Sequence, residues 1–458
     1  MNIEKEKYGR IEKIEQYINR YLKKNKSNKI LKEIDMLEHP EKYVKNLLWN
    51  DNKAELNSFI KYFKSDKNNI AKLTKLKQKY NAIVDKLEVQ VTNIIDMHPT
   101  LINEKDKYGN NLGMIAAKNR LPNITNLFLD NEEASIMQNN DGQNIGMVAA
   151  ESMLEDCVIK ALKNPIASIQ QDKLKNNIGI YAAKNKLKKA TNIALDNYEA
   201  SLQQNLYGYN IGLAAIENRL PEDIVIKAIE NKKAATQVDI TGFNMGMGAA
   251  IVGYEKAVLK ALDNKTAASY INSLGKTIAI YSAYMGLKSA VSKALKDEKL
   301  YLHQDIDGMC LPMFTPILGL EKEALEALDN KKLALMQNKE GKTIGMLCAL
   351  CKMEKATLKA LENKEASLLQ DNEGRTIGMY AGKCNIKQAS IKAVENKDAL
   401  KLKDIDGWDL AMHTCKFTGD KEASKRVKEY YEKNECKRRE YEQDNTDYMG
   451  GMTTPACD

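Results

Sequence analysis

Aromatic residues make up only 6% of this 458-residue chain, and its apolar content comes mainly from Ala, Leu, Ile and Met. That composition favours stacked helices. No run approaches the roughly 18 uninterrupted apolar residues of a membrane-spanning helix. Residues 1–26 also lack the apolar stretch of a secretory signal. We therefore expect a soluble, cytoplasmic protein, with non-Sec export to a host cell as the alternative.

The sequence also lacks the signatures of an enzyme. It has no P-loop and no GxGxxG segment following a strand. Its four histidines are dispersed, and no Ser/Cys–His–Asp arrangement accompanies them. The sequence therefore predicts a non-enzymatic protein that needs no cofactor. The histidines are His39, His98, His303 and His413.

The dominant positive feature is a period. Turn positions recur ten times; eight of the nine intervals are 33 residues, and the one from Gly208 to Gly242 is 34. A fixed step of this size indicates one supersecondary element stacked on copies of itself. Each repeat is named below by its turn residue, and positions are counted from it. The turn residues are Gly109, Gly142, Lys175, Gly208, Gly242, Gly275, Gly308, Gly341, Gly374 and Gly407.

Three positions predict the local structure of the repeat. Position −3 is Asp or Asn in all ten repeats, which is typical of a tight turn. Position +2 is Asn, Thr or Asp in nine repeats, and an apolar helical run follows this N-cap residue. A second helical run starts near Pro122 and Pro221 in their repeats. It usually ends at an Asn at +22, interpreted as the left-handed residue that stops the helix. We expect a turn, an inner helix, a loop and an outer helix.

This pattern resembles the ankyrin repeat over roughly residues 103–430. The Thr or Asn cap of the family's T-P-L-H box is kept, whereas Pro, Leu and His become Ile, Gly and Met. We expect the Gly at +4 to allow closer helix packing, with the Met at +5 filling the space. The resemblance implies an all-α helical solenoid that binds other proteins. The matching segments include Asn144-Ile145-Gly146-Met147 and Thr376-Ile377-Gly378-Met379.

The two ends of the chain lack the repeat. Residues 1–98 predict a helical N-terminal domain that also caps the array, which spans residues 99–430. Residues 431–458 are assigned to the end of a charged helix and a flexible tail. Within the array, Pro316 lies inside an inner helix and is expected to shorten or kink it. That repeat, which also contains Pro312, is either a drifted copy that still stacks or a hinge. The N-terminal helices are expected near 3–24, 28–36, 40–48, 52–64 and 68–97.

The cysteines are expected to be reduced and structural. Most of the eight lie within helical patterns rather than in loops that disulfides would link. Cys348 and Cys351 form a CxxC pair, with Cys384 and Cys415 in the next two repeats. Zinc-binding CxxC pairs usually sit on turns, whereas this pair lies in a helical run. We therefore expect buried thiols and no metal site.

The pair of residues at positions +9 and +10 changes from polar to apolar along the array. At +9/+10 the early repeats carry polar pairs such as Lys118 and Asn119, whereas the Gly242 to Gly341 repeats carry apolar pairs. A contiguous exposed apolar patch marks a contact surface, and neighbouring aromatic residues extend it. Burial against the N-terminal domain or a second copy, and ordinary packing between repeats, are the alternatives. The predicted partner-binding residues are Tyr207, Tyr209, Phe243, Ile251, Val252, Tyr281, Tyr284, Met285, Phe314, Ile317, Leu318 and Leu350.

Charge supplies a second hypothesis. The net charge is +8, and residues 1–100 hold 21 Lys/Arg against 14 Asp/Glu, so the array is nearly neutral. We predict a non-enzymatic scaffold whose concave array face binds a partner protein. By analogy with ankyrin-like arrays of host-associated microbes, it would be a host-directed or regulatory factor. Alternatively, residues 1–98 act on nucleic acid or an anionic membrane while the repeats select the location. The lysine-rich segments 20–32 and 61–79 are otherwise solvated faces.

Overall fold

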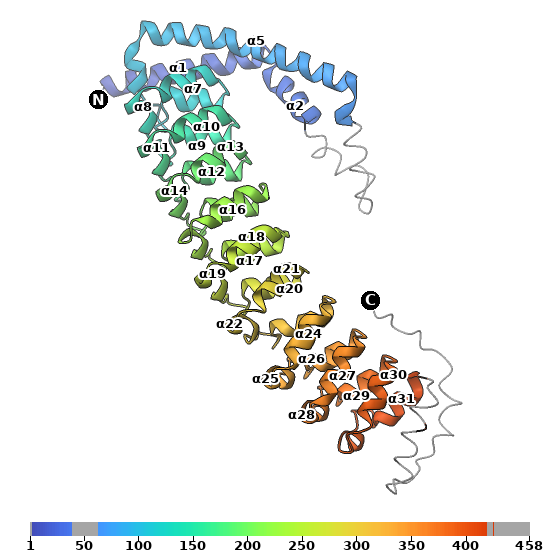
Figure 1. Cartoon of the computed structure of the whole chain (residues 1–458). Helices are drawn as coiled ribbons and strands as arrows, with labels where there is room; N and C mark the ends of the chain where they lie inside the picture. The colour runs from blue at the N-terminus through green and yellow to red at the C-terminus, as the bar shows by residue number, and fades with distance from the viewer. Residues whose placement is uncertain (1, 39–62, 419–424, 426–458) are drawn as a thin grey trace. The chain divides into compact units, whose positions relative to one another are not determined.

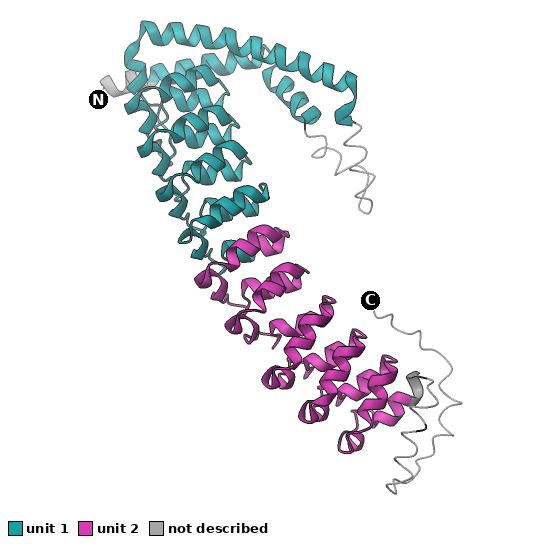
Figure 2. Ribbon diagram, in the orientation of Figure 1, with its two compact units in different colours: residues 1–248 teal, residues 249–458 magenta. Residues whose placement is uncertain are grey.

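The computed structural model describes residues 2–38, 63–418 and 425, and the chain divides into two compact units, 1–248 and 249–458 (Figure 2). The described residues form helices and turns with no strand, apart from three isolated bridges beside turns. From Leu112 onward, short helices recur about every 33 residues (Figure 1). The predicted all-α helical repeat solenoid is therefore confirmed. In this part of the chain no helix is both long and apolar enough to cross a membrane.

The N-terminal region consists of long amphipathic helices. Asp66 starts the longest of them by accepting hydrogen bonds from Asn68 N (2.7 Å) and Asn69 N (3.1 Å). The Tyr17 hydroxyl donates to Gln90 Oε1 at 2.7 Å and so joins the first helix of the region to this longest one. The helices expected near 3–24, 28–36 and 68–97 are confirmed, whereas 40–48 and 52–64 lie outside the described residues. The elements are α1 (Asn2–Lys24), α2 (Ser27–Glu38), α5 (Lys67–Met97) and the 3-10 helix η1 (Pro99–Asn103).

Helix α5 meets the first repeat as an outer helix of a preceding repeat would. Glu88, only 2% exposed, accepts hydrogen bonds from Asn123 N at 2.7 Å and from Ile124 N at 3.4 Å, at the start of the first outer helix. In the array Glu155 accepts in the same way from Lys189 N at 2.8 Å. Burial raises the pKa of the Glu88 carboxyl, although these hydrogen bonds oppose the shift. Helix α5 thus packs against the start of the first outer helix.

The inner helices begin at their predicted caps. The side chain of Asn144 accepts from Met147 N at 3.0 Å, and that of Thr376 accepts from Met379 N at 3.3 Å. These bonds satisfy backbone donors that the first helical turn leaves without partners. The inner helices are α6 (Leu112–Lys118), α9 (Ile145–Glu151), α12 (Ile178–Lys184), α15 (Ile211–Glu217), α17 (Met245–Val252), α20 (Ile278–Tyr284), α23 (Phe314–Ile317), α26 (Ile344–Leu350), α29 (Ile377–Lys383) and α31 (Leu410–Thr418).

Each inner helix except α31 is followed at +11 by a residue with positive φ, and an outer helix follows. In the Gly109 and Lys175 repeats this residue is not glycine: Arg120 has φ 56° and Lys186 has φ 59°. This left-handed position was not predicted from the sequence. The outer helices are α7 (Pro122–Leu129), α10 (Glu155–Leu162), α13 (Lys188–Ala194), α16 (Glu222–Glu230), α18 (Glu255–Leu262), α21 (Lys288–Ala294), α24 (Glu321–Leu328), α27 (Glu354–Glu362) and α30 (Lys387–Ala393).

A third short helix completes the repeat, and it corrects the interpretation of the Asn at +22. Asn131 has φ −89° and ψ 120°, so it is extended rather than left-handed, and its side chain accepts from Ala134 N at 2.9 Å. The residue starts the third helix as an N-cap. The third helices are α8 (Glu132–Ile136), α11 (Pro165–Ile169), α14 (Tyr198–Leu202), η2 (Ala234–Thr236), α19 (Lys265–Ser269), α22 (Glu298–Tyr301), α25 (Lys331–Leu335), α28 (Lys364–Leu368) and η4 (Ala399–Lys401).

The proline-containing Gly308 repeat has the shortened inner helix that Pro316 predicts. Its inner segment is a 3-10 turn, η3 (Leu311–Met313), followed by only four α-helical residues in α23. Cys310 occupies the cap position without making a side-chain cap bond. The repeat nevertheless keeps its outer and third helices, α24 and α25.

Side-chain amides at position −4 tie neighbouring repeats together. Gln138 Nε2 donates to Gly142 O of its own turn and, at 3.0 Å, to Gln171 O of the next repeat. Gln337 makes the same pair of bonds, the second to Gln370 O at 2.9 Å. Because both acceptors are backbone carbonyls, one side chain fixes a turn and its neighbour together.

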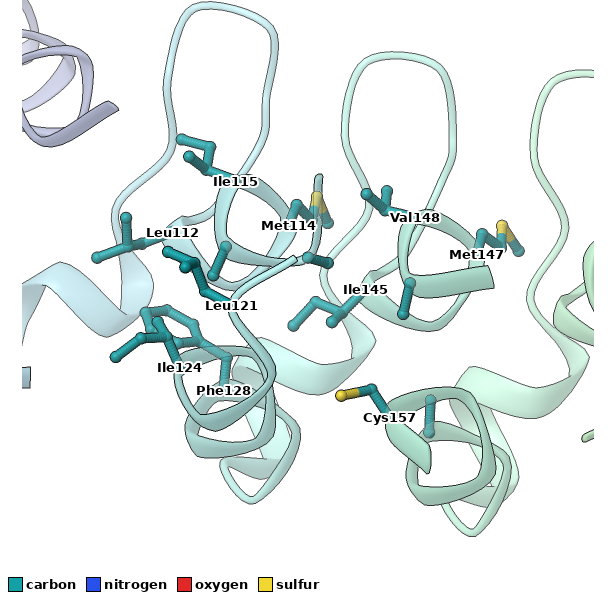
Figure 3. Close-up of a cluster of buried hydrophobic side chains, with 14 of the residues drawn as sticks. Leu112, Met114, Ile115, Leu121, Ile124, Phe128, Ile145, Met147, Val148 and Cys157 are labelled. Atoms are coloured by element: carbon teal, nitrogen blue, oxygen red, sulfur yellow. The ribbon is translucent and has the colours of Figure 1, made fainter. Parts of the chain in front are cut away.

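Glycine at +4 brings the helices of adjacent repeats close together. A Cβ at Gly146 would lie 2.6 Å from Ile178 Cδ1 and 2.7 Å from Ala161 Cβ, closer than van der Waals contact allows. Figure 3 shows the equivalent site one repeat earlier, where Ile145 lies between the two repeats above Phe128 and Cys157. The expectation that this glycine permits close packing is confirmed.

Replacing Gly146 with Ala should destabilise unit 1 by about 1–3 kcal/mol, because the overlap with Ile178 and Ala161 outweighs the better helix propensity of Ala. Gly9→Ala in α1 is the matched control, since a Cβ there meets nothing within 4 Å. That variant should gain roughly 0.5–1 kcal/mol. Urea denaturation followed by circular dichroism measures both changes. Equal effects of the two substitutions would contradict the packing argument.

Candidate partner-binding surface

The predicted partner-binding residues fall in both compact units, and each group is described by itself. In unit 1, Tyr207 is exposed at a turn tip, whereas Tyr209 and Phe243 are half-buried. In unit 2, the exposed side chains are Ile251, Tyr284, Met285 and Ile317, with exposed fractions of 43%, 43%, 47% and 55%. Their half-buried neighbours are Val252, Leu318 and Leu350.

Two residues expected on this surface are buried instead. Tyr281 and Phe314 are 7% and 4% exposed, so neither extends the patch. Both occupy position +6, which points into the packing between repeats rather than outward. Tyr281 Oη accepts a hydrogen bond from Asn272 Nδ2 at 2.9 Å, and the Phe314 ring packs edge-on against Tyr284 with centroids 4.9 Å apart. These two aromatic residues support the surface from beneath.

Tyr284 is held in place at the middle of the unit 2 surface. Besides the Phe314 contact, Lys276 Nζ lies 3.9 Å from its ring centroid, and its hydroxyl donates to Asp305 Oδ2 at 3.2 Å. Burial and the carboxylates of Asp305 and Asp307 raise the pKa of this hydroxyl, so it stays protonated. A half-exposed aromatic ring fixed from three sides costs little conformational entropy when a partner binds it.

Glycine at +11 coincides with the apolar pairs. The Gly242, Gly275 and Gly308 repeats carry Gly253, Gly286 and Gly319 at this position, with φ of 82°, 75° and 72°. Other repeats hold a side chain there in the same backbone conformation, for example Lys352 at φ 56°. A Cβ at Gly253 or Gly286 would meet nothing within 4 Å, so packing does not require glycine. Glycine at +11 therefore leaves no long polar side chain beside the apolar pairs.

In unit 1 the same face is polar and internally paired. Gln143 Nε2 donates to Tyr181 Oη at 3.0 Å and to Glu151 Oε2 at 3.2 Å, and Lys184 donates to Asn176 Oδ1 at 3.1 Å. Burial raises the pKa of the Glu151 carboxyl. The Gln143–Glu151 and Asn176–Lys184 pairs join positions +1 and +9, which shows that the two columns line one face of the repeat. The Lys276–Tyr284 contact is their counterpart in unit 2.

Four of the five described thiols are buried packing groups, whereas the expectation of a buried thiol was wrong for Cys351. Cys157, Cys310, Cys348 and Cys384 are buried, whereas Cys351 is exposed. Burial raises the pKa of the Cys157 and Cys310 thiols to about 11 and raises that of Cys348 as well, which disfavours the thiolate. Among the described residues, no group of three or more His, Cys, Asp or Glu side chains is arranged to hold a metal ion.

Comparison of the chain with protein-family models and with curated proteins gave no match. The glycines at +11 and the contact between Lys276 and Tyr284 were not predicted from the sequence. Comparing position +11 between repeats would have shown three consecutive glycines, but the contact requires the positions of both side chains.

Position +6 also predicts a pH dependence in the last repeat. His413 is buried with its Nε2 2.8 Å from Asp404 Oδ2, and burial lowers its pKa despite this carboxylate. The unfolded chain therefore takes up a proton first, and stability should fall as the pH drops below about 6.5. Trp408, whose ring centroid lies 5.5 Å from the imidazole, reports unfolding by its fluorescence.

The His413→Gln variant should show a flatter stability curve between about pH 7 and pH 5, because glutamine does not titrate. Urea midpoints followed by Trp408 emission, with both chains carrying Trp49→Phe so that Trp408 is their single tryptophan, measure it. A wild-type curve that is already flat in this range would contradict the assignment.

Proposed function

We propose that this chain is a divergent ankyrin-type array that acts as a non-enzymatic scaffold and binds a partner protein through the apolar surface of unit 2. The observation that carries the proposal is the coincidence of apolar pairs at +9/+10, each with at least one exposed side chain, with glycine at +11 in three consecutive repeats. Those pairs are Ile251 with Val252, Tyr284 with Met285, and Ile317 with Leu318.

Large apolar side chains gathered on one face are costly to solvate, and such patches mark interaction sites in soluble proteins. The glycines support a close approach by the partner, because Arg or Lys at +11 would hold it away and would have to be desolvated. The fixed ring of Tyr284 fits the role of an interface anchor.

Substitution of Ile251 and Ile317 together by Asp should abolish capture of the partner from native cells, since it places two charges in the contact. A second variant, Gly286→Lys, puts a long cation at +11 in a conformation that Lys352 already adopts, so the scaffold tolerates it at a cost of about 1 kcal/mol. Cross-linking should map the partner to these three repeats.

The matched control replaces Ile166 and Tyr198 by Asp. These residues of unit 1 are 54% and 62% exposed and lie at the starts of α11 and α14, where Asp is favourable. The control variant should keep every captured partner. Partners that remain bound to a folded Ile251→Asp/Ile317→Asp chain would refute the proposal.

A second candidate function rests on the corner between α1 and α2. Lys23, Lys24, Lys26 and Lys29 are all exposed there, and none forms an ion pair within the described residues. Such a cluster suits a nucleic-acid backbone or an anionic membrane. Replacing all four by Gln should then lower the affinity for a duplex oligonucleotide or for phosphatidylserine vesicles by more than about tenfold at low salt. Unchanged binding to both would exclude this role.

A further inference from the structure

A second apolar surface lies on the turn tips of unit 1, away from the +9/+10 column. Leu174, Leu206, Tyr207 and Ile240 occupy positions −2 and −1 of three consecutive turns, and we name these four residues the tip surface. Their exposed fractions are 45%, 53%, 49% and 72%. Turn tips are usually formed by glycine and small polar residues, so four large apolar side chains here need an explanation.

Turn geometry does not require apolar residues at these positions. The turn bonds come from position −3, where Asn205 Oδ1 accepts from Tyr207 N and Tyr209 N at 2.9 and 3.0 Å. Several repeats close the same turn with a polar residue at −2. Those polar residues are Lys107, Asn140, Lys173, Lys339 and Asn372.

The tips are held in place before any contact forms. Leu206 N donates to Leu174 O at 3.0 Å, and Ile240 N donates to Tyr207 O at 3.1 Å, so backbone bonds join the three turns. Gln204 Nε2 adds a bond to Val238 O at 2.9 Å. A surface that is fixed before binding loses little conformational entropy when it binds.

Lysines accompany the apolar groups of the tip surface. Lys173 and Lys175 flank Leu174 in the chain, are exposed, and form no ion pair within the described residues. At the Gly109 tip, Lys107 lies 5.1 Å from the ring centroid of Tyr108, another exposed tip residue. Asp141 is the one exposed acid at positions −2 to 0 of the unit 1 turns. These tips therefore combine exposed apolar groups with an excess of positive charge.

The turn tips of unit 2 carry apolar side chains without that charge. Ile306 and Ile405, both at −2, are exposed. Each is followed directly by an acid, Asp307 and Asp406 respectively. The chain therefore contains apolar tips of the same backbone type beside the opposite charge, and these provide a matched comparison.

A membrane interface suits the tip surface better than another protein does. A protein partner must be shaped to each exposed side chain, whereas a fluid interface accepts such side chains at any spacing. Leucine, isoleucine and tyrosine enter the boundary between headgroups and acyl chains, and neighbouring lysines are attracted to anionic headgroups. The long stems of Lys173 and Lys175 allow their ammonium groups to stay at the headgroups while Leu174 is buried.

We propose that the tip surface of unit 1 binds the interface of anionic membranes. The apolar side chains of the three turns enter the boundary between headgroups and acyl chains, and Lys173 and Lys175 bind the anionic groups of the lipids. A peripheral contact of this kind needs no membrane-spanning helix. It uses neither the +9/+10 column nor the lysines at the corner between α1 and α2, so it does not rest on the functions proposed above.

Vesicle co-sedimentation of the purified full chain tests the proposal. The chain should bind vesicles of phosphatidylcholine with about 30% phosphatidylserine at about 0.15 M salt, and bind pure phosphatidylcholine vesicles about tenfold more weakly. Leu206→Asp with Ile240→Asp should lower the affinity for the mixed vesicles by more than about tenfold, because anions replace apolar groups. Lys173→Gln with Lys175→Gln should lower it by about tenfold, as expected for two lysines near an anionic surface.

The matched control is Ile306→Asp with Ile405→Asp, which adds the same two charges at the same turn position in unit 2. This control should bind the mixed vesicles like the wild type. A chain with Gln at the four lysines of the α1/α2 corner should also keep its binding at the same salt concentration. The Ile251→Asp/Ile317→Asp chain should bind the vesicles too, which separates this site from the protein-binding surface.

A tryptophan placed on the tip surface reports insertion directly. Tyr207→Trp is made in a chain that also carries Trp49→Phe and Trp408→Phe, so that residue 207 is the single tryptophan. Its emission should shift to the blue when mixed vesicles are added and should be quenched by brominated lipids, because the indole moves from water into the interface.

Three results of co-sedimentation would each overturn the proposal in favour of a protein partner. They are a wild-type chain that ignores the mixed vesicles, a folded Leu206→Asp/Ile240→Asp chain that binds them like the wild type, and an equal loss in the unit 2 control. Vesicle binding that leaves the emission of residue 207 unchanged, or that disappears in the α1/α2 corner variant alone, would also overturn it. Circular dichroism checks that each variant is folded.

Discussion

The architecture depends on one buried side-chain amide in each early repeat, at position +2. Asn144 is fully buried; its Oδ1 accepts from Met147 N at 3.0 Å, and its Nδ2 donates to Ala167 O and Gln170 Oε1, both at 2.9 Å. A single group thereby joins the start of the inner helix to the end of the third helix. Without it, buried polar groups would lose their partners at about 1–3 kcal/mol each. The repeat can stack because this junction is satisfied from within.

Local chemistry made much of the fold predictable. Asp or Asn at −3, a cap at +2 and Gly at +4 each have a single backbone purpose, and all three do what their spacing predicts. The prediction for the Asn at +22 was wrong because Asn can either end a helix in the left-handed conformation or start one as an N-cap. The short helix that follows has too few residues to show a helical period. The left-handed position, +11, was not predicted because residues such as Arg120 and Lys186 rarely adopt positive φ, so their presence does not indicate it.

The candidate surface was only partly predictable for a different reason. Ile251, Tyr284, Met285 and Ile317 are exposed as expected, since the last turn of the inner helix faces outward. Tyr281 lies one helical turn before Tyr284, yet it is buried, with its hydroxyl bound to Asn272. Apolarity in the sequence does not separate a side chain that supports a surface from one that forms it. That distinction requires the neighbouring repeat in place.

The left-handed residue at +11 has a consequence for how such arrays diversify. Gly, Lys, Arg, Met and Asn all occupy this position in one backbone conformation, with φ between 54° and 82°. Where glycine stands, at Gly253 and Gly286, a Cβ would point into open space. Side-chain size and charge there can vary almost independently of the scaffold. Substitutions at +11 can therefore change the surface of the array, and with it what the array binds, while the helical backbone stays the same.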